Sequence, residues 1–137
     1  MKQMKYQKNR KIELLYNAIY KNYHYYILNL GTHPTAYVEI PKEHKLYGKD
    51  YNNIDIDVHG GLTYSNDKLF ISQFTILDNS WFLGWDYAHC YDYSGYYEAD
   101  DFLNTQAKKW TTEEIIEECK NAIDQIIDLE SEWLYEM

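Results

Sequence analysis

The sequence of 137 residues contains only two cysteines, two prolines and six glycines. Cys90 and Cys119 have neither the spacing of a zinc motif nor the number needed for a disulfide framework, so we expect two free thiols. No apolar run approaches the roughly 20 residues that a membrane-spanning helix needs. The basic N-terminal residues are not followed by the apolar segment of a signal peptide. These absences predict a cytoplasmic protein without membrane contact.

The familiar motifs of nucleophilic catalysis and phosphate binding are absent as well. The chain has no G-x-S-x-G nucleophile elbow and no glycine-rich loop of the P-loop type. We therefore predict no catalytic residue and no cofactor, and we favour a binding protein over an enzyme.

Positive charge is scarce in the C-terminal part of the chain. The net charge is -9, but residues 1–50 carry nine Lys or Arg against four acidic residues, and residues 51–137 carry four against eighteen. The basic segment could bind nucleic acid, but a strongly acidic protein repels a polyanion, so direct nucleic-acid binding is not expected. We interpret it as neutralising the acidic segment, within the chain or across a dimer. The sixteen tyrosines suit interfaces and ligand pockets, and a homodimer or higher homo-oligomer is expected.

Apolar periodicity predicts a helix near each end of the chain. Apolar side chains recur at spacings of three and four in residues 9–30. Residues 111–137 repeat the pattern, with Thr111 or Thr112 as the N-cap and Glu114 placed for a capping box.

The segments between the two helices are typical of β-strands. A proline closes the first of them, and Gly60 and Gly61 predict a tight turn that returns the second as a hairpin. The predicted strands are residues 35–41, 54–59 with its return at 62–65, 68–77 and 81–90.

These elements predict an α+β fold, an antiparallel sheet of about four strands flanked by an N-terminal and a C-terminal helix. The whole chain, residues 1–137, is predicted to be a single domain. Within it, residues 1–30 would form a helical extension and residues 35–137 the α+β core.

Asp55, Asp57 and His59 alternate with apolar residues and would project from one face of a strand. A row of this kind is typical of a solvated strand face. The alternative is that His59, at the end of the strand, contacts a ligand. Gly60 and Gly61 would then let backbone N–H groups approach that ligand closely.

A second polar cluster consists of Asp86, His89 and Asp92. A turn near Ala88 would bring Asp86 and His89 together, and His59 could then complete the cluster. Two imidazoles and two carboxylates could hold a divalent cation, but their spacing matches no compact metal motif, so we predict no bound metal.

We predict that the two segments form one ligand site, in which aromatic rings stack on a planar ligand and a few polar groups orient it. An alternative is that the aromatic residues form an ordinary core and a dimer interface. The predicted site comprises His59, Gly60, Gly61, Thr63, Tyr64, Trp85, Asp86, His89, Tyr91 and Asp92.

The segments YVEIPKEHKLYGKDY, DVHGGLTYS, WFLGWDYAHCYDY and EEIIEECKNAIDQI together resemble a family of small uncharacterised phage and prophage proteins. The shared motifs are H-G-G-L-T and G-[WF]-D-x-A-H-x-x-D, and the resemblance spans about residues 37–127. It implies an origin in a mobile element more than an activity. Cys90 and Tyr91 replace the small residues that often follow the second histidine, and residues 1–30 lie outside the resemblance.

Three functions remain open on this basis. The favoured one is capture of a small nucleotide-like ligand, such as a host-defence signal, in an anti-defence role. The second is an acidic protein-binding inhibitor of a host defence or nucleic-acid-binding protein, acting through Glu113, Glu117 and Asp124. The third is a metal-assisted hydrolase that would use the two histidines together with Asp86 and Asp92.

Overall fold

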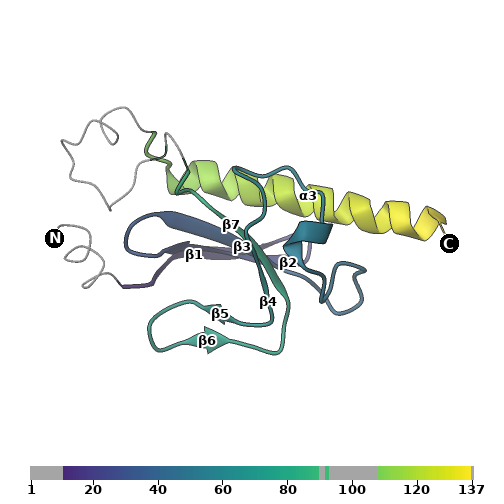
Figure 1. Ribbon diagram of the computed structural model, residues 1–137, viewed down its shortest axis with the longest axis horizontal. Helices are drawn as coiled ribbons and strands as arrows, with labels where there is room; N and C mark the ends of the chain where they lie inside the picture. The colour runs from purple at the N-terminus through teal and green to yellow at the C-terminus, as the bar shows by residue number, and fades with distance from the viewer. Residues whose placement is uncertain (1–10, 90–91, 93–107, 137) are drawn as a thin grey trace.

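The computed structural model describes residues 11–89, 92 and 108–136, with side chains described as far as Ser131. A five-stranded antiparallel sheet carries one long helix along one face, and a small two-stranded sheet lies on the other side (Figure 1). The predicted α+β class and the C-terminal helix are therefore confirmed. The five strands, in spatial order, are β1 (Glu13–Tyr20), β2 (Tyr23–Asn29), β3 (Pro34–Glu39), β7 (Phe82–Asp86) and β4 (Tyr64–Asn66).

The predicted N-terminal helix is wrong, because residues 13–29 form the antiparallel hairpin of β1 and β2. Lys21 and Asn22 make its turn with φ angles of 50° and 70°, the left-handed values of a tight hairpin turn. In β2, Tyr25 and Ile27 pack beneath the helix while Tyr26 and Leu28 pack on the opposite face. Both faces of this strand are buried, so apolar residues occupy successive positions instead of every second one. Some of them therefore fall at the spacings of three and four that are typical of a helix.

Residues 54–58 do not form the predicted strand, although their side chains alternate between buried and exposed positions as predicted. Ile56 and Val58 are buried, and Asp55 and Asp57 are exposed. The segment lies beside α3 (Thr112–Glu136), and side chains of that helix take the place of a partner strand. The Asp57 N–H donates to Oε1 of Gln125 at 2.7 Å, and Nε2 of Gln125 donates to the Asp57 carbonyl at 2.8 Å.

The segments on either side of Gly60 and Gly61 do not pair with each other as the predicted hairpin requires. The two glycines do form a turn, with the Gly61 N–H donating to the Val58 carbonyl at 2.9 Å. The chain then continues into β4, which pairs with β7.

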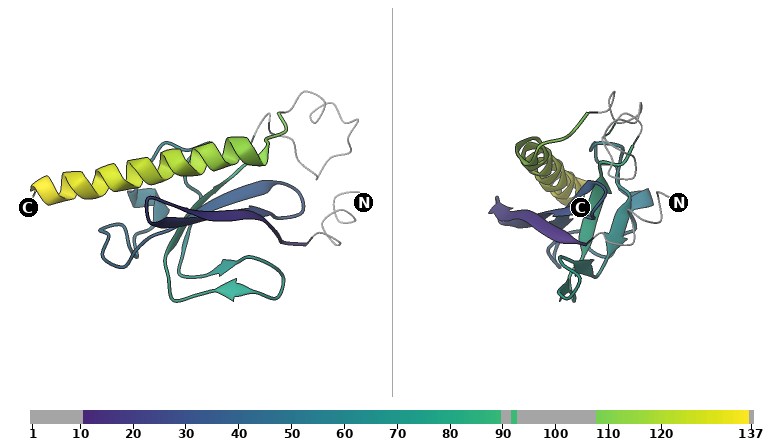
Figure 2. Two further views of the ribbon diagram at one scale, coloured as in Figure 1. Left: turned by 180° about the vertical axis from the view of Figure 1, so that it is seen from behind. Right: turned by 90° about the vertical axis from the view of Figure 1, so that its left-hand side faces the viewer.

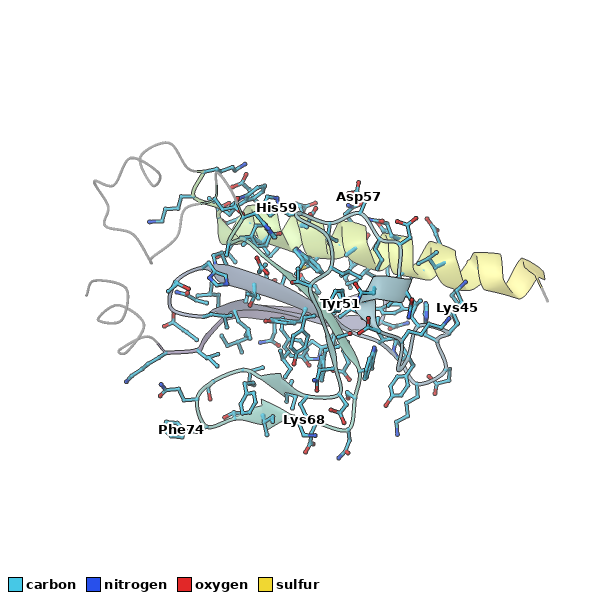
Figure 3. All side chains as sticks on the ribbon, viewed as in Figure 1. Lys45, Tyr51, Asp57, His59, Lys68 and Phe74 are labelled. Carbon is cyan, nitrogen blue, oxygen red and sulfur yellow. The ribbon has the colours of Figure 1, made fainter. Side chains whose placement is uncertain are left out.

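Residues 68–77 form two short strands instead of the single buried strand that was predicted. β5 (Leu69–Phe70) and β6 (Ile76–Leu77) pair as a hairpin. Leu69 is buried, but Phe74 is 94% exposed and Ile76 is 38% exposed, so only part of the apolar run reaches the core. Phe74 extends from this hairpin away from the sheet (Figure 3).

The strands predicted at 35–41 and 81–90 correspond to β3 and β7, which pair with each other, but β7 ends at Asp86 and residues 87–89 are not part of it. Gly84 in β7 lies close to its neighbours in β3, where a Cβ would lie 2.9 Å from the Ala36 carbonyl oxygen. A Cβ at Gly84 would lie 2.3 Å from Cδ1 of Tyr37.

Helix α3 begins with the predicted capping box. The Thr111 N–H donates to Oε1 of Glu114 at 3.1 Å, and the Glu114 N–H donates to Oγ1 of Thr111 at 3.2 Å. Figure 2 shows the helix along one face of the sheet and the β5–β6 hairpin on the other. Its buried stripe, which packs on the sheet, is Ile115, Cys119, Ala122, Ile123 and Ile126.

Cys119 is a fully buried free thiol within this stripe, and burial raises its pKa. It is therefore a core residue without nucleophilic character. Within the described part of the chain, no helix has both the length and the apolar composition to cross a membrane.

Candidate functional site

The polar cluster lies where β7 ends, beside the first turns of α3. His59 follows the buried segment ending at Val58, and Figure 3 places it next to the N-terminal part of the helix. The His59 N–H donates to Oε1 of Glu118 at 2.6 Å. Gly60 and Gly61 then turn the chain with φ angles of 69° and 81°, which glycine adopts without strain.

Asp92 is the centre of the cluster. Its Oδ2 lies 2.7 Å from Nε2 of His59 and accepts the His89 N–H at 3.0 Å, while Oδ1 accepts Nε1–H of Trp110 at 2.8 Å. The Asp92 side chain is only 4% exposed. A buried carboxylate with this many hydrogen-bonding partners is well satisfied, and it fixes the three groups that bind it.

Aromatic rings hold the His59 side chain in one orientation. The imidazole stacks on Tyr87 with ring centroids 4.9 Å apart and planes 7° apart, and Trp110 lies 4.8 Å away. Tyr87 is fully buried and accepts a hydrogen bond from Nε1–H of Trp85 at 3.0 Å. Burial raises the pKa of the Tyr87 hydroxyl, so this ring is a neutral platform for the imidazole.

Asp86 and His89 form a second imidazole–carboxylate pair. Nε2 of His89 lies 3.2 Å from Oδ1 of Asp86, but without the alignment of a hydrogen bond. Asp86 also accepts hydrogen bonds from Oγ1 of Thr63 at 3.1 Å and from the Ala88 N–H at 3.1 Å. A Cβ at Gly60 would lie 2.1 Å from Nε2 of His89, so the ring fits only because residue 60 is glycine.

The two predicted segments therefore meet. The imidazole rings of His59 and His89 are 5.5 Å apart between centroids, at an angle of 70°. Of the ten predicted site residues, the structure brings together His59, Gly60, Thr63, Asp86, His89 and Asp92.

The remaining predicted residues have other roles or locations. Trp85 is buried in the core behind the cluster, and Tyr64 packs against Tyr37 and donates to the Lys68 carbonyl. Gly61 shapes the turn, with no atom near the position of a Cβ. Tyr91 lies outside the described residues.

Sequence reasoning missed three residues of the cluster: Trp110, Glu118 and His33. Glu118 lies between Ile115 and Ala122 along the apolar stripe of α3. A charged residue at such a position indicates that its side chain binds a polar group of another segment. The residues around Trp110 do not indicate its role, because that role depends on a hydrogen bond to Asp92. Burial lowers the pKa of His33, and Asp86, His89 and Asp92 all act on it electrostatically.

The cluster offers imidazole nitrogens, carboxylate oxygens and a hydroxyl, which can donate to or accept from a ligand. Among the described residues, no group of three or more His, Cys, Asp or Glu side chains could hold a metal ion. The metal-assisted alternative therefore gains no support from the described part of the chain.

Fold and cluster together define an α+β protein with two imidazole–carboxylate pairs at one end of strand β7. Comparison with protein-family models, with curated proteins and with solved structures found no match.

Proposed function

We propose that the cluster of His59, Thr63, Asp86 and His89 binds a small nucleotide-like ligand. The observation that carries this proposal is the contrast in exposure within the cluster. The side chains of His59, Asp86 and His89 are 25%, 27% and 34% exposed, whereas Asp92, which binds the His59 ring and the His89 backbone, is 4% exposed. Partly open polar groups that are already fixed in position lose little conformational entropy when a ligand binds.

The groups available suit the polar edge of a nucleobase. Asp86 can accept from a base N–H, and the Thr63 hydroxyl and the imidazoles can each donate or accept. Lys108 lies beside the cluster, with Nζ 4.0 Å from the ring centre of Trp110 and 2.7 Å from Oε2 of Glu114. A nucleobase would therefore find complementary partners in the cluster, and an attached phosphate would share Lys108 with Glu114.

The resemblance to phage proteins extends this proposal to a biological role. A phage-encoded protein of this kind would act in the host cytoplasm and would sequester a nucleotide signal of a host defence system. A homodimer, with the ligand bound by each protomer, is compatible with this role.

Thermal denaturation in the presence of individual 5′-mononucleotides and cyclic nucleotides tests the proposal. A nucleotide at 100 times its Kd stabilises a protein by about 2.7 kcal/mol, which raises the midpoint by several degrees. Asp86→Asn should remove this shift, because the amide no longer offers a second acceptor. Asp55→Asn makes the same chemical change at an exposed position and should preserve the shift. The proposal fails if none of the nucleotides raises the midpoint.

A second candidate, binding of a basic protein partner, is favoured by the outer surface of α3. Glu113 and Asp128 are exposed there, and the Glu117 side chain is 78% exposed. Asp124 is less available, because it already binds Lys21 at 2.9 Å. Under this alternative, Glu113→Lys with Glu117→Lys abolishes partner binding in a pull-down, and His89→Gln does not.

A further inference from the structure

Both imidazole rings of the cluster direct the same nitrogen toward a carboxylate. Nε2 of His59 faces Asp92 at 2.7 Å, and Nε2 of His89 faces Asp86 at 3.2 Å. Among the described residues, no hydrogen bond engages Nδ1 of either ring. His59 therefore has Nε2 hydrogen-bonded to a carboxylate, His89 has Nε2 beside one without a hydrogen bond, and in both rings Nδ1 makes no hydrogen bond to the described residues.

The pairing of His59 with Asp92 has the features of an oriented base. A carboxylate can only accept hydrogen bonds, so the contact assigns the proton of neutral His59 to Nε2 and leaves the lone pair on Nδ1. Asp92 is held in turn by Trp110 and by the His89 backbone, so the ring cannot turn without breaking this network. This is how a buried aspartate orients a catalytic histidine.

We infer that His59 and His89 are a general base and a general acid that cleave a ribose phosphodiester without a metal. The inference rests on the proposed nucleotide binding and specifies what happens to the bound ligand. His59 and His89 are the catalytic residues, and Asp92 and Asp86 are positioning residues.

The reaction needs only these two proton transfers. Nδ1 of His59 takes the proton of the ribose 2′-hydroxyl, and the 2′-oxygen attacks the adjacent phosphorus. The bond from phosphorus to the 5′-oxygen breaks, and protonated His89 gives its Nδ1 proton to that oxygen. The products are a 2′,3′-cyclic phosphate and a 5′-hydroxyl, with no net change in atoms or electrons.

The contents of the cluster favour an internal nucleophile in the substrate. The Thr63 hydroxyl donates a hydrogen bond to Asp86 and, among the described residues, makes none to either imidazole. A neighbouring ribose hydroxyl supplies its own nucleophile, so a base and an acid 5.5 Å apart between ring centres suffice.

The test uses ribodinucleoside monophosphates of every base combination in excess EDTA, with products separated by chromatography. The wild-type protein should release the 2′,3′-cyclic phosphate and should leave the matching 2′-deoxy compound intact. His59→Gln and His89→Gln should each slow cleavage by about 10²- to 10⁴-fold, the usual contribution of acid–base catalysis. Asp55→Asn, purified in the same way, should cleave at the wild-type rate, and thermal denaturation verifies that each variant is folded.

The outcomes separate the two proposals. Binding of the 2′-deoxy compound without cleavage of the ribose form overturns the catalytic inference and leaves the binding function standing. Absence of binding to either compound overturns both. Cleavage that EDTA abolishes, or that both glutamine variants retain, overturns the acid–base assignment.

Discussion

At the residue scale, Gly60 and Gly61 allow a matched comparison. Both have positive φ angles, so an alanine at either position costs about 1 kcal/mol or more in backbone strain. A Cβ meets no atom within 4 Å at Gly61, but at Gly60 it would lie 2.1 Å from Nε2 of His89. Gly60→Ala must therefore displace the His89 ring as well.

We expect Gly60→Ala to lower the free energy of unfolding more than Gly61→Ala does, and to move the NMR resonances of the His89 imidazole. Urea denaturation measures the first effect, and a ¹H–¹⁵N spectrum of the histidine side chains measures the second. Equal stability of the two variants, with unchanged His89 resonances, would show that the ring does not depend on the missing side chain.

The residues of the cluster were predictable to the extent that their roles are local. His59, Asp86, His89 and Asp92 stood out because histidines and acids flanked turn residues near strand ends. Their pairing also required that the segments meet, which the sequence could suggest but not establish. Trp110 reaches Asp92 across eighteen residues of chain, and nothing in its neighbourhood predicts that contact.

At the scale of elements, a side chain of the helix replaces a missing strand. Gln125 makes two hydrogen bonds to the backbone of Asp57, as a neighbouring strand would. Gln125→Ala leaves both backbone groups without these partners and should cost about 1–3 kcal/mol of unfolding free energy. Amide hydrogen exchange at Asp57 should accelerate at the same time.

Asn121, exposed one helical turn before Gln125, provides the control. Asn121→Ala also replaces an amide with alanine, but it improves helix propensity by up to about 0.7 kcal/mol and removes no hydrogen bond to residues 54–59. If the two variants unfold at the same urea concentration and Asp57 exchanges at the wild-type rate in both, the side chain of Gln125 does not hold this segment.

The same interaction explains which elements the sequence could predict. Helix α3, β3 and β7 carry their signals locally, in caps, periodicity and flanking turn residues. Residues 54–58 alternate between apolar and polar residues as a strand does, but their backbone bonds to a side chain of a helix. The alternation shows which side chains are buried and does not show which groups bond to the backbone. The β1–β2 hairpin was missed because apolar residues on both faces of β2 hide its period of two. The local signal of the hairpin is Asn22, a residue type that tolerates the left-handed conformation its turn requires.

At the scale of the whole molecule, buried tyrosines on both faces of the sheet make the stability of the fold depend on pH. Tyr25 and Tyr87 are buried beneath the helix, and Tyr26 and Tyr37 are buried on the opposite face. Burial is the main cause that raises the pKa of all four, to about 12 for Tyr25 and for Tyr37. The fold therefore stabilises the neutral hydroxyl on both sides of the sheet.

This arrangement predicts alkaline unfolding. A tyrosine whose folded-state pKa lies above its unfolded value of 10.0 contributes its full stability below pH 10 and loses it as the pH rises toward about 12. For Tyr25, which is 2% exposed, that difference corresponds to an upper bound of about 3 kcal/mol.

Urea denaturation midpoints should be constant up to about pH 10 and then fall steeply, and the absorbance of ionised tyrosine should rise in step with loss of the fold. Tyr25→Phe removes one of these groups, so its midpoint should fall less between pH 10 and pH 12 than that of the wild type. A midpoint that does not change over that range, or complete tyrosine ionisation near pH 10 in a protein that is still folded, would show that burial does not hold these hydroxyls neutral.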